Sequence, residues 1–360
     1  MNYSIKFQSL IHRLEKEADQ NLKFVGMGNP NSPILLVGKE CAIDRNSSRG
    51  EGCYQMEQYR NVEQWAYNIQ NNISSCDVED WVNASSFDEG RYNPLYPYKG
   101  QFNKPAIRDA EGSSCNGGTS ATWCAYQKLI GKIFSEDKSE YIDFHQRSFM
   151  TELSAEVMLQ SSYSIKTKQS IDVRCGSLLC DPFYRSFPIV IVACGRYIGQ
   201  YNINLEQVFD QKYIGEDKDN VGWMHIHENC GRLLIHTRHL VMCSDALMDK
   251  IATRVRTFLM NPLLKYCIYY DGTDESAASS LMAFYEKCWL WSSIMNESNF
   301  LEENVREMLV NDINSDWIDG FCIPRTLVGI FFNRYCHWVG LWKKEEFMDW
   351  FENVRKGNIV

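Results

Sequence analysis

The sequence predicts an α/β protein with a mainly parallel central sheet flanked by helices, followed by a helical C-terminal extension. Residues 34–37 and 187–194 are almost wholly apolar and rich in branched side chains, as strands covered on both faces are. Segments with helical periodicity lie between these strands. Strands that alternate with helices along a chain are typical of parallel sheets, and this alternation gives the fold class.

The individual elements follow from local patterns. An amphipathic helix over 3–20 and the turn cluster Asn29-Pro-Asn-Ser-Pro33 precede the first strand. The elements expected after that strand are helices at 54–71, 119–134, 150–161, 169–180 and 245–259, and strands at 81–84, 187–194 and 232–235. After residue 261 the composition changes, and helices near 278–293, 298–312 and 344–355 surround an aromatic stretch. The predicted domains are therefore an α/β domain over 1–261 and an extension over 262–360.

Composition narrows the class of protein. The chain has 360 residues and a net charge of −9, but Lys287 and Arg306 are the only basic residues between 271 and 320, where the acidic excess lies. A phosphate-binding face on the remaining body is compatible with this distribution. No apolar run approaches the roughly 18 residues of a membrane helix, and the N-terminus lacks the apolar core of a signal peptide. We therefore expect a cytoplasmic protein without membrane association.

The 14 cysteines do not form a metal-binding pattern. No Cys-x-x-Cys pair occurs, and the nearest pair, Cys175 and Cys180, is too widely spaced for a zinc or iron–sulfur motif. In a large chain without a signal peptide, such cysteines are expected to be reduced thiols. The sequence therefore predicts neither a bound metal nor a cofactor.

Four predicted strands end on residues that can do chemistry. They end on Gly38-Lys39-Glu40, Asn83, Gly195 and His236-Thr-Arg238-His-Leu240. Ligands of open α/β sheets bind at the carboxyl ends of parallel strands. We therefore expect a glycine turn, a carboxylate, an amide and an imidazole to meet at one edge of the sheet.

At these strand ends the sequence resembles the uracil-DNA glycosylase superfamily over about residues 24–245. The motifs stand in the family's order: Pro33-Ile-Leu-Leu-Val-Gly38, Trp81-Val-Asn83, Cys180-Asp-Pro-Phe183 with Phe187-Pro-Ile-Val-Ile-Val-Ala-Cys-Gly195, and Leu234-Ile-His236-Thr-Arg-His-Leu240. In the family the first strand end positions water, the second carries an Asn that reads the base, and the last carries a His followed by a leucine that wedges into DNA. The resemblance implies excision of a damaged or modified base, with DNA favoured over RNA as the partner.

The resemblance also implies roles for single residues. Glu40, or Asp44 nearby, would hold the attacking water or stabilise the sugar cation, and His236 would stabilise the charge that develops on the leaving base. Asn83 would pair with the edge of the flipped base. The other expected substrate contacts are Gly38, Lys39 and Gly195 around the pocket, Arg238 on a phosphate, and Leu240 in the vacated stack position.

Two departures from the family leave alternatives open. Lys39-Glu40-Cys41 stands where the family has a proline, and Thr237-Arg238 follows His236 in place of Pro-Ser. A second hypothesis is therefore a catalytically inactive module that binds nucleic acid or nucleotide in the same pocket. A third is a metal-dependent hydrolase built on four histidines, His225, His227, His236 and His239.

Overall fold

The structure, a computed structural model, describes residues 1, 3–81, 92–109, 114–134, 138–158, 163–229 and 232–260. The chain divides into two compact units, Met1–Lys132 with Glu136–Ala252, and Ile133–Ser135 with Thr253–Val360. The first unit contains the sheet and the candidate site. The predicted extension over 262–360 lies outside the described residues, and the predicted boundary at 261 stays a prediction.

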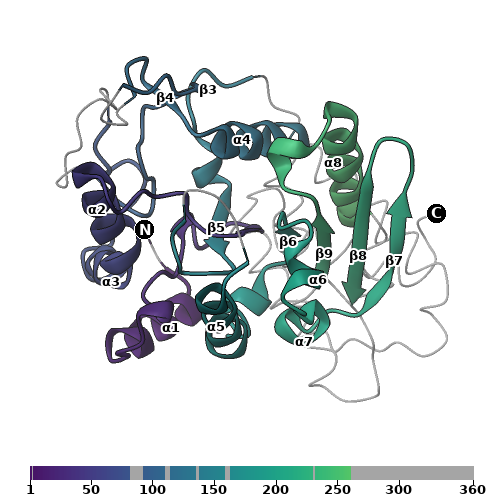
Figure 1. Cartoon of the computed structure of the whole chain (residues 1–360), viewed down its shortest axis with the longest axis horizontal. Coiled ribbons are helices and arrows are strands. Elements are labelled where there is room, and N and C mark those ends of the chain that lie inside the picture. The colour runs from purple at the N-terminus through teal and green to yellow at the C-terminus, as the bar shows by residue number, and fades with distance from the viewer. Residues whose placement is uncertain are drawn as a thin grey trace, which may run out of the picture. The chain divides into compact units, whose positions relative to one another are not determined.

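A mixed sheet of seven strands forms the centre of the first unit, as far as the structure describes it (Figure 1). Its order is β1-β5-β2-β6-β9-β8-β7. The strands are β1 (Met27–Gly28), β2 (Ile34–Gly38), β5 (Ser148–Glu152), β6 (Ile189–Val192), β7 (Tyr213–Lys218), β8 (Trp223–Asn229) and β9 (Arg232–Thr237). Two further strands, β3 (Phe102–Pro105) and β4 (Gly118–Thr119), pair with each other in a separate sheet.

The α/β class is confirmed, but the prediction of a mainly parallel sheet is wrong. Only the four central strands, β5, β2, β6 and β9, run parallel to one another. The outer pairings, β1 with β5, β9 with β8 and β8 with β7, are all antiparallel. The edge strands β1 and β7 were not predicted from the sequence. Strand β1 has only two residues, and half of the residues of β7 are charged, so neither contains a buried apolar run.

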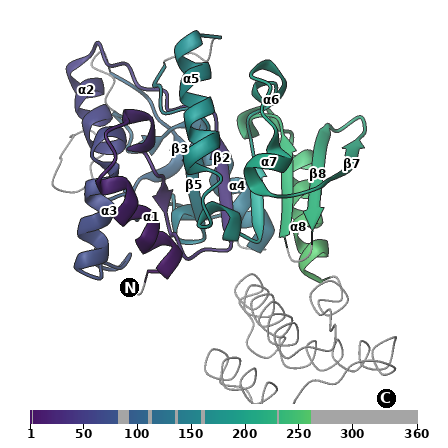
Figure 2. The ribbon, with the colours of Figure 1, turned by 90° about the horizontal axis from the view of Figure 1, so that it is seen from below.

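Helices cover both faces of the sheet. The α-helices of the described residues are α1 (Ile5–Glu15), α2 (Ser48–Tyr54), α3 (Asn61–Gln70), α4 (Ala121–Phe134), α5 (Ile165–Val173), α6 (Tyr197–Gln200), α7 (Leu205–Phe209) and α8 (Asp245–Met260). The short 3-10 or π-helical segments are η1 (Gln20–Leu22), η2 (Gln55–Tyr59), η3 (Phe144–Gln146), η4 (Arg174–Leu178), η5 (Tyr184–Ser186) and η6 (Leu240–Met242). Helices α1, α5 and α7 lie on one face, and α4 lies on the other (Figures 1 and 2).

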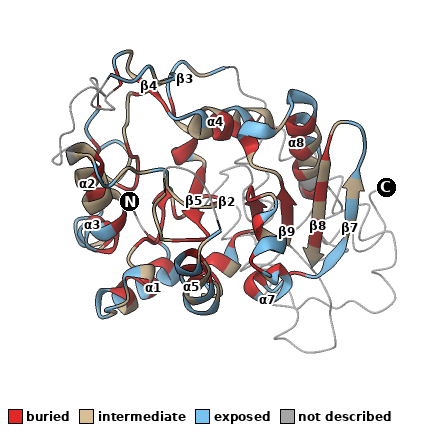
Figure 3. Ribbon diagram, viewed as in Figure 1, coloured by how far each residue is buried: buried red, intermediate tan, exposed pale blue. Residues whose placement is uncertain are grey.

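The central strands form because their side chains are buried on both faces. Every residue of β2 and β6 is buried, and Figure 3 shows this core between the helical layers. On the face of the sheet that α1 covers, Phe7 of α1 packs edge-on against Trp65 of α3, with 5.0 Å between the ring centroids. At the edge, β7 alternates between exposed and half-buried residues and carries charges, which discourage pairing with another chain.

Strand β5 replaces an expected helix. The prediction of a helix over 150–161 is wrong, because Ser148–Glu152 pairs in parallel with β2. All five residues of β5 are buried, including the polar Ser148, Thr151 and Glu152. The strand expected at 81–84 is not confirmed: Trp81 has no strand pairing in the structure, and residues 82–84 lie outside its described part. The strand next to β2 therefore carries Glu152 at its end.

The parallel strands end together, as the sequence predicted for β2, β6 and β9. Gly38 is in register with Glu152, and Val192 is in register with His236. Functional groups that follow these residues consequently lie along one edge of the sheet. Separately, none of the described helices is long and apolar enough to cross a membrane.

Candidate functional site

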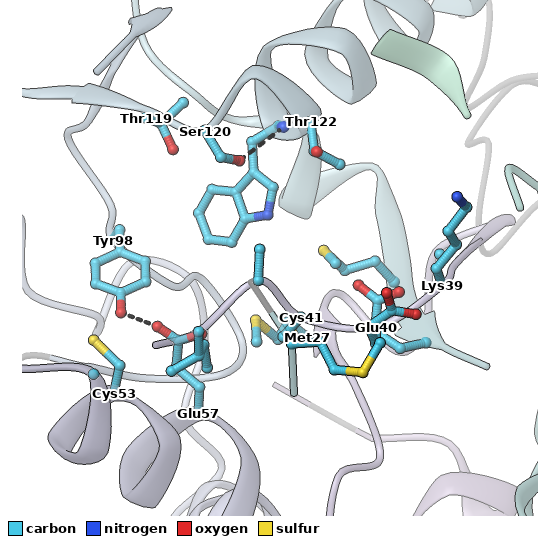
Figure 4. Close-up of a pocket in the computed structure, with 18 of the residues that line it drawn as sticks. Met27, Lys39, Glu40, Cys41, Cys53, Glu57, Tyr98, Thr119, Ser120 and Thr122 are labelled. Atoms are coloured by element: carbon cyan, nitrogen blue, oxygen red, sulfur yellow. Dashed lines mark hydrogen bonds between the residues drawn. The ribbon is translucent and has the colours of Figure 1, made fainter. Parts of the chain in front are cut away.

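A pocket of about 660 Å³ opens at the carboxyl ends of β2 and β5 (Figure 4). The strand-end side of its wall includes the segment 38–44, which begins at the last residue of β2, and Glu152 at the end of β5. Residues of α2, of η2 and of the start of α4 also line it. Two residues that come after β9, His239 and Met242, line it as well. This volume falls within the range of about 300–1,000 Å³ for small-molecule sites. The strand-end edge predicted from the sequence therefore does form a cavity.

The segment after β2 is held in place by backbone hydrogen bonds. The N–H of Leu153 donates to the carbonyl of Gly38 at 2.9 Å, and the N–H of Ser154 donates to the carbonyl of Lys39 at 2.9 Å. Further on, the N–H of Met158 donates to the carbonyl of Cys41 at 3.1 Å. Because these bonds continue the pairing of β2 with β5, the predicted residues Gly38, Lys39 and Glu40 occupy defined positions in the wall.

Tyr197 fixes the side chains of Lys39 and Glu40. The Tyr197 hydroxyl donates to Oε1 of Glu40 at 3.1 Å, and Nζ of Lys39 lies 4.6 Å from the centre of the Tyr197 ring. Tyr197 begins α6, directly after the turn at Gly195, whose φ is +56°. Tyr197 was not among the predicted site residues, although its place just after the third strand end pointed to this edge of the sheet.

Glu152 is the most unusual group in the pocket. Its side chain lines the cavity, the residue is 6% exposed, and Oε2 has no hydrogen-bond partner among the described residues. The pKa of Glu152 is raised to about 8, mainly by burial and to a smaller extent by Glu40, while Arg174 acts in the opposite direction. At neutral pH the Glu152 carboxyl is therefore protonated.

The absence of a side chain at residue 38 makes room for this carboxyl. A Cβ placed on Gly38 would collide with Oε2 of Glu152. We expect Gly38→Ala to lower the free energy of unfolding by about 0.5–1.5 kcal/mol in chemical denaturation, the cost of moving the Glu152 side chain from its rotamer, because the methyl meets only the end of that side chain. The matched control is Gly176→Ala in η4, where the added methyl meets no atom within 4 Å; it should raise stability by about 0.4–1 kcal/mol. Equal stability of Gly38→Ala and the wild type would contradict this packing.

A second buried carboxyl, that of Glu57, also lines the pocket. The Tyr98 hydroxyl donates to Oε1 of Glu57 (Figure 4), and burial raises the pKa of Glu57 to about 7. Aromatic rings also line the cavity: the Tyr98 ring is 5.7 Å from that of Trp123 on α4, and Tyr126 is a further lining residue. Aromatic faces together with groups that hydrogen-bond suit a flat, polar ligand.

Asp44 lines the same pocket but serves the local turn. Its Oδ1 accepts from the N–H of Asn46 at 3.0 Å, and its carbonyl accepts from the Ser47 hydroxyl at 2.9 Å. These bonds hold the chain as it enters α2, where the Ser47 hydroxyl in turn accepts from Gly50. Of the two carboxylates predicted for catalysis, Glu40 is therefore the one held by a tyrosine hydroxyl, and Asp44 is engaged with its own backbone.

His236 and Gly195 do not line this pocket. His236 is 4% exposed, and its Nε2 donates to the carbonyl of Gly195 at 2.9 Å while Nδ1 lies 3.3 Å from Nδ1 of His225. Burial lowers the pKa of His236 to about 4, so the imidazole is neutral at neutral pH. In this arrangement His236 joins the ends of β6 and β9, and His239, three residues on, reaches the pocket.

The remaining predicted contacts occupy different environments. Leu240 is 0% exposed, whereas the nearby Met242 is 68% exposed and borders the pocket. Arg238 is half-buried beside the Gly195 turn and is absent from the pocket wall. Asn83 lies outside the described residues. The substrate contacts expected of Leu240, Arg238 and Asn83 stay predictions. The structure adds four residues to the pocket wall and one beside Glu40: Glu152, Trp123, His239 and Met242, and Tyr197.

Three of the four histidines of the third hypothesis, His225, His227 and His236, lie in a cluster of aromatic rings, whereas His239 lines the pocket. The ring of His225 is 4.9 Å from that of Trp223 and 5.2 Å from that of His236, and His227 lies against Tyr213. In the described ranges, no group of three or more His, Cys, Asp or Glu side chains is arranged to hold a metal ion. A metal-dependent hydrolase therefore gains no support from this cluster.

Comparison of the chain with protein-family models, with curated proteins and with solved structures finds no match. The chemistry of the pocket is therefore the basis for assigning a function.

Proposed function

We propose that this protein binds a base of DNA in the strand-end pocket and hydrolyses the bond between the base and its sugar. One observation carries the proposal: Glu40, held by Tyr197, lies in a single pocket with the neutral Glu152 and the rings of Trp123 and Tyr98. A base in a duplex must leave the stack before an enzyme can act on it. A cavity with aromatic sides and a few fixed polar groups suits an extruded base.

Glu40 supplies the reactive group in this mechanism. Its carboxylate orients a water molecule toward the sugar carbon and stabilises the positive charge that develops on the sugar as the bond to the base breaks. The electron pair of the broken bond leaves with the base. Glu40 takes one proton from the water as the water oxygen bonds to the sugar carbon, and this proton then passes to the base anion. Because Tyr197 and the backbone bonds of 38–41 fix the carboxylate in advance, little reorganisation is needed at the moment of reaction.

Basic and apolar groups in the pocket wall suit a DNA strand. Lys39, Arg49 and Arg108 line the pocket, and cationic side chains in such positions bind phosphate and hold the strand in register. Met242 is exposed at the border, whereas Leu240 is fully buried. We therefore assign the wedge that fills the vacated stack position to Met242.

The proposal is tested with duplex and single-stranded oligonucleotides that each contain one uracil, hypoxanthine, xanthine or oxidised or alkylated base. After incubation with the protein, alkali cleaves the strand wherever a base has been removed. Cleavage at one or more of these bases is the expected result. Binding without cleavage across the whole panel would contradict the proposal and favour the catalytically inactive module of the same fold.

A further inference from the structure

Glu152 combines three properties that a structural carboxyl does not need. It is 6% exposed, it lines the pocket, and its Oε2 lacks a hydrogen-bond partner in the part of the chain that the structure describes. Most buried polar atoms in proteins are hydrogen-bonded, and an unsatisfied one costs about 1–3 kcal/mol. The unsatisfied Oε2 of Glu152 destabilises the fold, and a ligand that hydrogen-bonds to this atom would explain why it is unpaired without the ligand.

The surroundings of Glu152 favour its neutral form. Burial is the main cause of its raised pKa, followed by Glu40, while Arg174 of η4 acts in the opposite direction. The other titratable groups that interact with its charge are thiols and a phenol that are themselves buried, namely Cys41, Cys194 and Tyr126. A neutral carboxyl has one O–H donor beside one carbonyl acceptor, which is the arrangement that a carboxamide presents.

We propose that Glu152 contacts the ligand directly through both carboxyl oxygens, as a paired donor and acceptor. The ligand class is then a planar heterocycle with an N–H next to a carbonyl, or an amino group next to a ring nitrogen. This inference rests on the proposed function, which places a base in the pocket, and adds how its edge is recognised. Glu152 stands at the end of the strand next to β2, and its carboxyl passes directly over Gly38.

The proposed contact gives ligand binding a defined pH dependence. Below the Glu152 pKa of about 8 the carboxyl donates and accepts. As the pH rises through that value, the proton is lost and the carboxylate faces the ligand's carbonyl with negative charge. Affinity should therefore fall about tenfold for each pH unit above the pKa. An amide at the same position has no such titration.

The test measures binding of free uracil and free hypoxanthine by calorimetry, at pH values from about 6 to about 9. The proteins are the wild type, Glu152→Gln, Glu152→Met, and the control Glu63→Met on the exposed surface of α3. We expect Glu152→Gln to bind nearly as well as the wild type at pH 6 and without pH dependence. Glu152→Met should lose about 10- to 100-fold in affinity, as loss of a paired base contact does, while its melting temperature equals or exceeds that of the wild type. Glu63→Met should bind as the wild type does.

Three results would overturn the inference: wild-type affinity in Glu152→Met, the same pH dependence in Glu152→Gln and the wild type, or failure of both free bases to bind. These results are separable from failure of the proposed function, which is scored by strand cleavage. Base binding without cleavage refutes the function alone. Cleavage that Glu152→Met retains at the wild-type rate refutes the inference alone.

Discussion

Replacement of Glu40 by Gln is expected to lower the rate of base removal by about 100- to 10,000-fold, the usual contribution of a positioned acid or base. The amide retains the size of the side chain and still accepts from the Tyr197 hydroxyl, which lies 3.1 Å from Oε1 of Glu40. It cannot accept a proton from water or balance the charge on the sugar. The measurement is the single-turnover rate of alkali-labile site formation, with Glu63→Gln on the exposed face of α3 as the matched control.

Loss of the Tyr197 hydroxyl should lower the rate of base removal less than Glu40→Gln does, because it alters the position of the Glu40 carboxylate and leaves the carboxylate itself in place. Tyr197→Phe keeps the ring beneath Lys39 but removes the hydrogen bond to Glu40, and we expect about a tenfold lower rate with unchanged substrate affinity. A Glu40→Gln variant as active as the wild type would remove Glu40 from the mechanism, and Asp44 would then be the remaining predicted carboxylate in the pocket wall.

Replacement of Arg174 by Met is expected to lower the free energy of unfolding by about 3–5 kcal/mol, the cost of breaking a buried charged network. Arg174 is fully buried, and its guanidinium donates to the carbonyls of Asn21 and Phe24 at 2.8 Å and of Glu152 at 3.1 Å. It also donates to the Thr151 hydroxyl at 3.1 Å. Methionine has similar length but no donor, so these acceptors lose their partner.

The measurement for Arg174→Met is urea denaturation followed by circular dichroism. The matched control is Arg60→Met at the start of α3, where the arginine is about half exposed and pairs only loosely with Glu63; its stability should change by less than about 0.5 kcal/mol. Arg174→Lys should fall between the two, because it keeps the charge and loses the fork of donors. Equal stabilities of Arg174→Met and Arg60→Met would contradict the role of Arg174 in holding the end of β5.

The Arg174 network also explains which part of the fold the sequence predicted poorly. Strands β2 and β6 are continuous apolar runs, and both were predicted because burial on both faces leaves a direct trace in composition. Strand β5 is Ser-Phe-Met-Thr-Glu, and all three of its polar residues are buried. Arg174, 22 residues beyond Glu152 in the chain, donates to the Thr151 hydroxyl and to the backbone carbonyl of Glu152. A long-range partner of that kind leaves no local periodicity, so the segment was assigned to a helix.

The candidate site was predicted in part for the same reason. The segment 38–44 follows a strand with an unmistakable apolar signal, and its position in a pocket wall agrees with the expectation. Glu152 is the last residue of the misassigned strand, and Trp123 belongs to a helix whose apolar spacing indicates only packing. His236 stands at the predicted strand end, but its ring donates to the carbonyl of Gly195, a contact that depends on the turn after the neighbouring strand β6 rather than on local sequence.

The most direct test of base–sugar hydrolysis in this pocket is the identity of the products formed in water labelled with the heavy oxygen isotope. An oligonucleotide that is cleaved in the alkali assay is incubated with wild-type protein, and the intact strand and the small molecules are analysed by mass spectrometry. Attack of water on the sugar carbon predicts a free base together with an unbroken abasic strand that carries one heavy oxygen atom, both formed about 100- to 10,000-fold more slowly with Glu40→Gln. Release of a nucleotide, a strand broken at phosphate, or label on the base would contradict hydrolysis of the base–sugar bond in this pocket.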